Sequence, residues 1–122
     1  MGAGPVWGIS RVLSIQPDYF TGTDTYAATG SGQTIDAHLS PVREFGIQVA
    51  AVGGTPTLWT IILEGSLDGT NFSTILTHTQ ALGLGVILWS TVPAPVSYFR
   101  TRCSVLTLGA ASSATAYVLG VA

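Results

Sequence analysis

The chain has 122 residues, a length typical of one domain with its own hydrophobic core. Hydrophobic residues make up 47% of it and charged residues only 8%, against roughly 25% in ordinary soluble domains. There is no lysine and the formal net charge is −2, so the chain lacks the basic surface that sequence-independent binding to nucleic acid requires.

Three explanations compete for this low charge. A membrane protein is not expected, because no window reaches the ~18 uninterrupted apolar residues of a spanning helix. A secreted protein is not expected either, since the first residues show no basic leader followed by an apolar block. The third explanation is that other chains cover much of the surface, because the cores of interfaces are depleted in charge and in lysine. We favour the third explanation.

The chain is rich in glycine, threonine, serine, valine and isoleucine, and no segment shows the apolar period of a helix, which predicts an all-β protein. The first 42 residues are the less regular part. An arm or edge strand is expected around residues 12–15, where Pro17 ends it. A loop and short strands near residues 25–29 and 33–38 follow.

From residue 43 onward, strand-like and turn-like segments alternate at roughly the 8–12-residue spacing of sandwiches and jelly rolls. Strands are expected over residues 43–51, 58–65, 72–79, 86–91, 96–106 and 114–121. Pro93 and Pro95 are expected to end the fourth of these strands. The pattern predicts one domain, an antiparallel β-sandwich that is jelly-roll-like with about seven or eight strands. Residues 43–122 are expected to form its core, and residues 1–42 an N-terminal arm with short edge strands.

The clearest local signal is the segment Trp59–Thr77, in which an apolar strand, a Ser-Leu-Asp-Gly-Thr-Asn turn and a second strand follow one another. Gly69 tolerates positive φ, and the carboxylate of Asp68 can bond back to its own turn. We therefore expect Asp68, Gly69 and Asn71 to be structural turn residues. A calcium loop is not expected, because the further ligands and the terminal glutamate are missing.

Four bulky aromatic residues are predicted to anchor the core or an interface: Trp59, Phe72, Trp89 and Phe99. Trp59 and Trp89 lie within apolar strand segments, which favours this interpretation. The alternative is that the tryptophans and tyrosines form a platform on which sugar rings stack.

Three residues are candidate contacts between subunits. Trp7 lies in a segment flanked by glycine and proline and would be costly to leave exposed, so it is expected to dock on another chain. Arg100 and Arg102 lie two apart on one face of a strand. They are expected to pair with acids such as Glu44 or Glu64 across strands, or with a neighbouring subunit.

No pattern predicts a catalytic, metal or cofactor site. His38 and His78 stand apart from other metal ligands, and Cys103, the single cysteine, is expected to be a small buried side chain. No Gly-x-Ser-x-Gly elbow is present, and no motif places a base beside a nucleophile. The chain is therefore not expected to be an enzyme.

The segment Trp59–Leu76, followed by Tyr98-Phe99-Arg100-Thr101-Arg102, resembles small virion proteins of tailed bacteriophages. These proteins have a strand and turn of the pattern Leu-Glu-Gly-Ser-Leu-Asp-Gly-x-Asn-Phe. One further strand follows it, and then a strand of the pattern Tyr-Phe-Arg-x-Arg. The resemblance covers about residues 44–121. The Ser-x-Asp-Gly-x-Asn turn alone also occurs in discoidin-like and other carbohydrate-binding sandwiches.

The resemblance implies a structural component of the virion, assembled in the host cytoplasm, and no catalytic residue carries over. A capsid decoration (cement) protein that binds and reinforces the shell is the favoured function. The expected partners are the major capsid protein or other virion subunits and further copies of this chain, a trimer first; neither nucleic acid nor a membrane is expected. The alternatives are a glycan- or receptor-binding module of a tail fibre and a tail or connector ring component.

Overall fold

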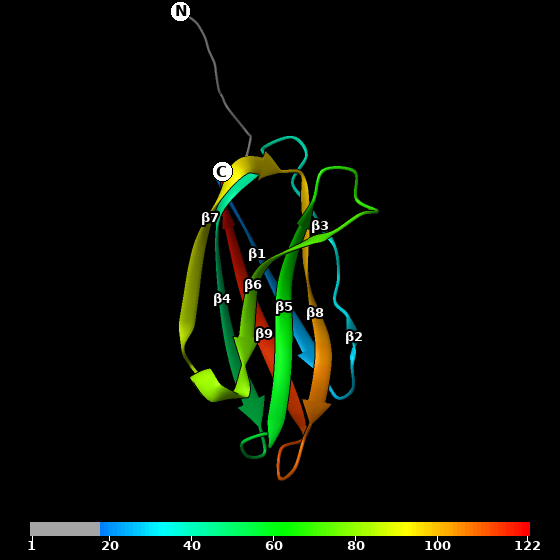
Figure 1. Cartoon of the computed structure of the whole chain (residues 1–122), viewed down its shortest axis with the longest axis vertical. Coiled ribbons are helices and arrows are strands. Elements are labelled where there is room, and N and C mark those ends of the chain that lie inside the picture. Colours follow the sequence, from blue (N-terminus) through cyan, green and yellow to red (C-terminus); the bar gives the residue numbers. More distant parts are fainter. Residues whose placement is uncertain (1–17) are drawn as a thin grey trace, which may run out of the picture.

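The computed structural model describes residues 18–122, which form nine strands and one short 3-10 helix (Figure 1). In chain order the elements are β1 (Tyr19–Tyr26), β2 (Gly30–Ser31), β3 (Ile35–Asp36), β4 (Val42–Val52), β5 (Leu58–Ser66), β6 (Ser73–Thr79), η1 (Gln80–Leu82), β7 (Ile87–Val96), β8 (Tyr98–Thr107) and β9 (Ser113–Val121).

Two antiparallel sheets pack face to face. The first has the strand order β1-β9-β4-β7, and the second has the order β2-β8-β5-β6, with β3 also paired to β8. In Figure 1 the second sheet lies in front of β4, β9 and β1. The prediction of an all-β antiparallel sandwich is confirmed.

Two elements differ from the expectation. β1 pairs with β9 over its full length, Tyr19 to Tyr26, where a loop and a strand over residues 25–29 were expected. β7 runs through Pro93 and Pro95 to Val96, so the prediction that these prolines end the strand was wrong. Proline is tolerated there because β7 is an edge strand, and the register shift opposite β4 leaves residues 92–95 without ladder partners.

The core lies between the sheets and is built from the inward residue of each alternating pair. Phe45 of β4 and Phe99 of β8 join the two layers edge to face, with ring centroids 5.3 Å apart. Trp59 and Cys103 are also buried. The largest of the fully buried side chains are Trp59, Phe45, Phe99, Ile47, Ile61, Leu63 and His78.

A chain of polar groups also crosses between the sheets. Tyr26 of β1 donates to the hydroxyl of Thr101 on β8 at 2.6 Å, and Thr101 donates to the carboxylate of Asp24 at 2.7 Å. The backbone N–H of Gln33 donates to the same carboxylate. Burial raises the pKa of Tyr26 to about 12, so the phenol stays protonated and can donate even near pH 10, where an exposed tyrosine is half ionised. The bridge fixes β1 against the second sheet.

His78 is buried in a neutral form. Trp59 donates its indole N–H to Nδ1 of His78 at 3.1 Å, so the imidazole proton resides on Nε2, which bonds to the carbonyl of Val86 at 3.2 Å. Burial lowers the pKa of His78, because the charged imidazolium loses its hydration, although the Val86 carbonyl opposes this effect.

The free energy of unfolding is therefore expected to fall as the pH drops below about 6.5, the ordinary pKa of histidine in an unfolded chain. In that range the unfolded state binds a proton that the folded state does not. The slope of the free energy of unfolding against pH therefore approaches about 1.4 kcal/mol per pH unit. Backbone hydrogen bonds lower the pKa of Asp36 and Asp68 as well, but their contribution is lost only below about pH 4. Urea unfolding between pH 7 and 5 measures the slope.

The control for this prediction is His78→Gln, which keeps a donor and an acceptor but does not titrate. The variant should lose the slope between pH 7 and 5. Equal slopes in the two proteins would show that another group carries the acid sensitivity.

Candidate interaction surface on the four-stranded sheet

The outer face of the first sheet carries almost no charge. Strand alternation turns one set of residues outward on this face, here called the open face: Tyr19, Thr21, Thr23, Thr25, Glu44, Gly46, Gln48, Ala50, Val52, Ile87, Trp89, Thr91, Ser113, Thr115, Tyr117, Leu119 and Val121. Among them only Glu44 is charged. The described part of the chain places no further strand or helix over this face, so the open face is a charge-poor surface that no described element covers.

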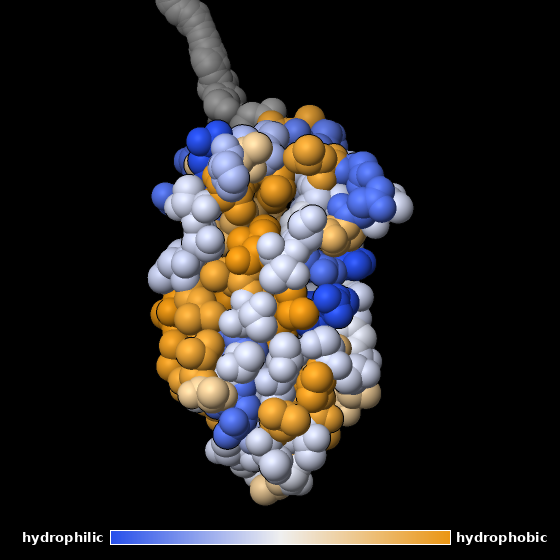
Figure 2. Space-filling model, viewed as in Figure 1, coloured by the Kyte–Doolittle hydropathy of each residue, from blue (hydrophilic) through white to orange (hydrophobic). Residues whose placement is uncertain are grey.

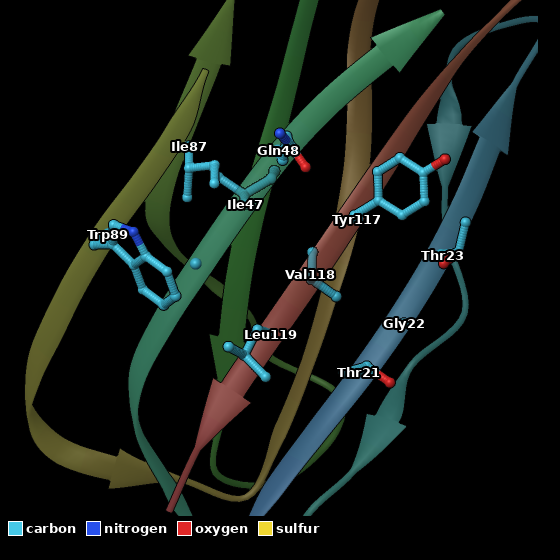
Figure 3. A pocket seen from close by; sticks show the side chains of 11 residues that line it. Thr21, Gly22, Thr23, Ile47, Gln48, Ile87, Trp89, Tyr117, Val118 and Leu119 are labelled. Atoms are coloured by element: carbon cyan, nitrogen blue, oxygen red, sulfur yellow. The ribbon is translucent and has the colours of Figure 1, made fainter. Parts of the chain in front are cut away.

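Trp89 is the largest apolar group on the open face. It lies beside Gly46 of β4 in the ladder, and 60% of its surface is exposed. A β-carbon placed on Gly46 would lie only 2.7 Å from Cζ3 of Trp89, so the indole rests directly on the backbone of β4 (Figure 3). The missing side chain at position 46 therefore allows one face of the indole to pack on the sheet and leaves the other free.

Around Trp89 the surface is shallowly hollowed. Ile87 and Tyr117 are exposed, and with Leu119 they border a depression of about 320 Å³ across β7, β4, β9 and β1 (Figure 3). Gln48 also lines it and donates its amide to the carbonyl of Gly85 at 2.9 Å, which fixes the loop before β7. The lining is mainly apolar and shows no group of residues suited to catalysis.

The Asp68 turn is a self-supporting hairpin. The carboxylate of Asp68 accepts the backbone N–H groups of Thr70 and Asn71, each at 2.8 Å, and the side-chain amide of Asn71. Gly69 has a φ of +78°, as the turn requires. These bonds hold the pKa of Asp68 far below its usual value. The turn residues predicted from the sequence therefore lie in one local network.

The two segments that carry the phage resemblance contact each other. The guanidinium of Arg100 lies 3.9 Å from the centre of the Phe72 ring, and its Nε donates to the carboxylate of Glu64 at 2.7 Å. Arg102 donates to the other oxygen of Glu64 at 3.2 Å. The Tyr98 ring packs beneath Gly69. The pattern is thus a packing unit on the outer face of the second sheet.

The remaining candidate residues have the following positions. Glu64, and not Glu44, pairs with the two arginines. Trp59 and Phe99 lie in the core, and Phe72 is half-buried against Arg100. Trp7 lies outside the described residues.

Residues 18–122 contain no group of three or more potential metal ligands. Cys103 is free and buried, and burial raises the pKa of its thiol. In the same range no helix is long and apolar enough to cross a membrane.

Comparison with known proteins shows the fold. No protein-family model and no curated protein sequence matches the chain. Among solved structures, the SPBc2 prophage-derived protein YomS is similar, with a TM-score of 0.58 and 12% identity over 91% of this chain and 98% of that chain. The Yersinia pseudotuberculosis-derived mitogen YPM has a TM-score of 0.51 and 10% identity over 86% of each chain. At these identities the likeness extends to the sandwich architecture alone.

Proposed function

We propose that this chain is a non-enzymatic structural subunit of a phage particle, a decoration protein that attaches to the capsid through the open face and reinforces the shell. The observation that carries the proposal is the open face itself, a charge-poor surface with an exposed tryptophan, Trp89, on its edge strand β7. Interfaces are depleted in charge at their core and are anchored by tryptophan and tyrosine. Trp89 and Tyr117 fit that role.

Three further observations support a place in a phage particle. Glu64, Phe72, Arg100 and Arg102 belong to the two segments that resemble small virion proteins in sequence, and they contact one another. A prophage-derived protein shares the fold. The chain carries little charge for its size, which suits a subunit surrounded by others in a virion assembled in the host cytoplasm.

The test is binding to particles stripped of this protein. Trp89→Ala is expected to weaken binding by about 30-fold or more, the loss typical of a central interface anchor of ~2 kcal/mol. Leu67→Ala is the matched control, because Leu67 is equally exposed but lies at the turn of the second sheet. A Trp89 variant that binds as wild type, or equal losses in both variants, would reject the open face as the attachment surface.

Reinforcement is tested separately. Particles that carry the protein should survive heat and osmotic shock better than stripped ones, because subunits bound across neighbours add free energy that bursting must overcome. Equal survival would reject the cement function while leaving attachment intact.

A second function, glycan binding, is favoured by the geometry of Trp89. Its indole lies flat on Gly46 with one face free, and Glu44 and Thr91 on the neighbouring row of the ladder supply an acceptor and a hydroxyl. Such a platform suits stacking of a sugar ring. Glycan-array binding by the wild type that is lost in Trp89→Ala would support this function; an array without hits would reject it.

A further inference from the structure

β1 is the free edge of the first sheet. The backbone N–H of Ala122 donates to the carbonyl of Asp18 at 2.9 Å, which identifies this pair as a hydrogen-bonded one. Because such pairs alternate in an antiparallel ladder, every second residue of β1 faces β9 and the residues between turn their N–H and C=O groups away from the sheet. The residues with outward backbone groups are Tyr19, Thr21, Thr23 and Thr25.

These outward groups bond to no backbone group in residues 18–122. The nearby strands β2 and β3 belong to the other layer, where both pair with β8. Gln33 reaches β1 through the inward carboxylate of Asp24 and not through the outer edge. The plane of the first sheet therefore ends in a row of unpaired donors and acceptors.

Among the strands of the described sandwich, the other edges are protected. β7 carries Pro93 and Pro95 and a register shift against β4. β6 has a register shift against β5, and the outer edge of β8 is covered by β2 and β3. β1 has no proline, no basic residue and no register shift. A regular edge of this kind, without proline or basic residues, favours pairing with another strand.

We propose that β1 pairs antiparallel with β1 of a second copy of this chain, about a twofold axis at Gly22. In this register Tyr19 lies opposite Thr25 of the partner subunit, and Thr21 lies opposite Thr23 of the partner subunit. It is the one register in which every outward N–H and C=O of the four residues meets a partner. Shifting it by two residues leaves one residue of each strand unpaired.

The side chains fit this arrangement. Pairs of threonines across strands are among the favourable cross-strand pairs. Asp24, the one charge on β1, is turned inward and already accepts hydrogen bonds from Thr101 and Gln33. In the proposed register it lies about four residues along the strand from Asp24 of the partner subunit, roughly 14 Å away, where screening is strong. Pairing would join the two open faces into one continuous surface.

The first experiment measures the oligomeric state of the full chain by sedimentation over a range of concentrations. The wild type is expected to form a dimer, in place of the trimer expected from the sequence. Thr23→Pro removes an outward N–H that the subunit itself does not use, and should weaken the dimer at least about tenfold. Thr23→Val keeps the backbone donor and should dimerise as wild type. A monomer at all concentrations, or a dimer unaffected by Thr23→Pro, would overturn the proposal.

The second experiment tests the register and does not depend on the proline variant. Opposed residues of a hydrogen-bonded pair have α-carbons ~5.5 Å apart, within the range of a disulfide. A mixture of Thr21→Cys and Thr23→Cys subunits should therefore cross-link on mild oxidation, whereas each variant alone should not. Cys103 is buried and provides the same low background in every sample. A mixture that fails to cross-link would overturn the proposed register.

Discussion

Replacing Trp59 by alanine is expected to lower the free energy of unfolding by about 3–5 kcal/mol, a large part of the 5–15 kcal/mol that stabilises a typical domain. The side chain is 1% exposed, so its removal leaves a cavity between the sheets. It also leaves Nδ1 of the buried His78 without its donor. Chemical denaturation followed by circular dichroism measures the loss.

Two further variants separate the contributions of the apolar volume, the indole hydrogen bond and burial to this loss. Trp59→Phe keeps most of the apolar volume and removes the indole N–H, so about 1–3 kcal/mol of the loss should remain. Trp89→Ala removes the same type of residue from the open face and should cost less than about 1 kcal/mol. Similar losses in Trp59→Ala and Trp89→Ala would contradict the division between a buried and a surface tryptophan.

The sequence was informative where structure is local. The Asp68 turn could be predicted because its hydrogen bonds join residues two or three apart. The strands β4 and β8 could be predicted because alternation marks a buried face directly, and β5 because it is apolar on both faces, as suits a central strand. The pairing of Arg100 and Arg102 was expected, but the choice of Glu64 over Glu44 depends on β5, and not β4, lying next to β8.

The open face could not be predicted for the same reason. A leucine precedes and a hydroxyl residue follows both Trp59 and Trp89, and the place of Trp89 on an edge strand, with its indole beside Gly46, leaves it exposed. β1 is rich in threonine and glycine, and its burial pattern follows from its pairing with β9, nearly a hundred residues away. Pairing between distant segments therefore decides which faces are open. In β1 itself, Thr21, Thr23 and Thr25 have the alternation of a strand.

The two sheets differ in how many of their outer groups have partners within the subunit. The second sheet carries the hairpin and the pairs among Glu64, Phe72 and Arg100, contacts that satisfy one another within the subunit. The first sheet ends in a free edge, and its outer face carries one charged residue and is covered by no strand or helix of residues 18–122. Under the proposed function, variants on the open face should therefore change binding without unfolding the domain.

Replacing Glu64 by glutamine is expected to destabilise the domain by about 2–3 kcal/mol, more than the loss of either arginine. The Glu64 side chain is 6% exposed and accepts from both Arg100 and Arg102, so its neutralisation leaves two adjacent positive charges without a counter-charge. The arginines still reach water, with 26% and 38% of their side chains exposed, which keeps the cost below that of a fully buried charge.

Single variants of the two arginines test whether Glu64, Arg100 and Arg102 act as one unit. Arg102→Met should cost less than about 1 kcal/mol, because the shorter bond from Arg100 still neutralises Glu64. Arg100→Met should cost more than Arg102→Met, since it also removes the stacking on Phe72. In Glu64→Gln, Arg102→Met should then be neutral or stabilising, because it relieves the repulsion between the arginines. Denaturation of the four variants measures this order, and additive losses would show that the three charges do not act as one unit.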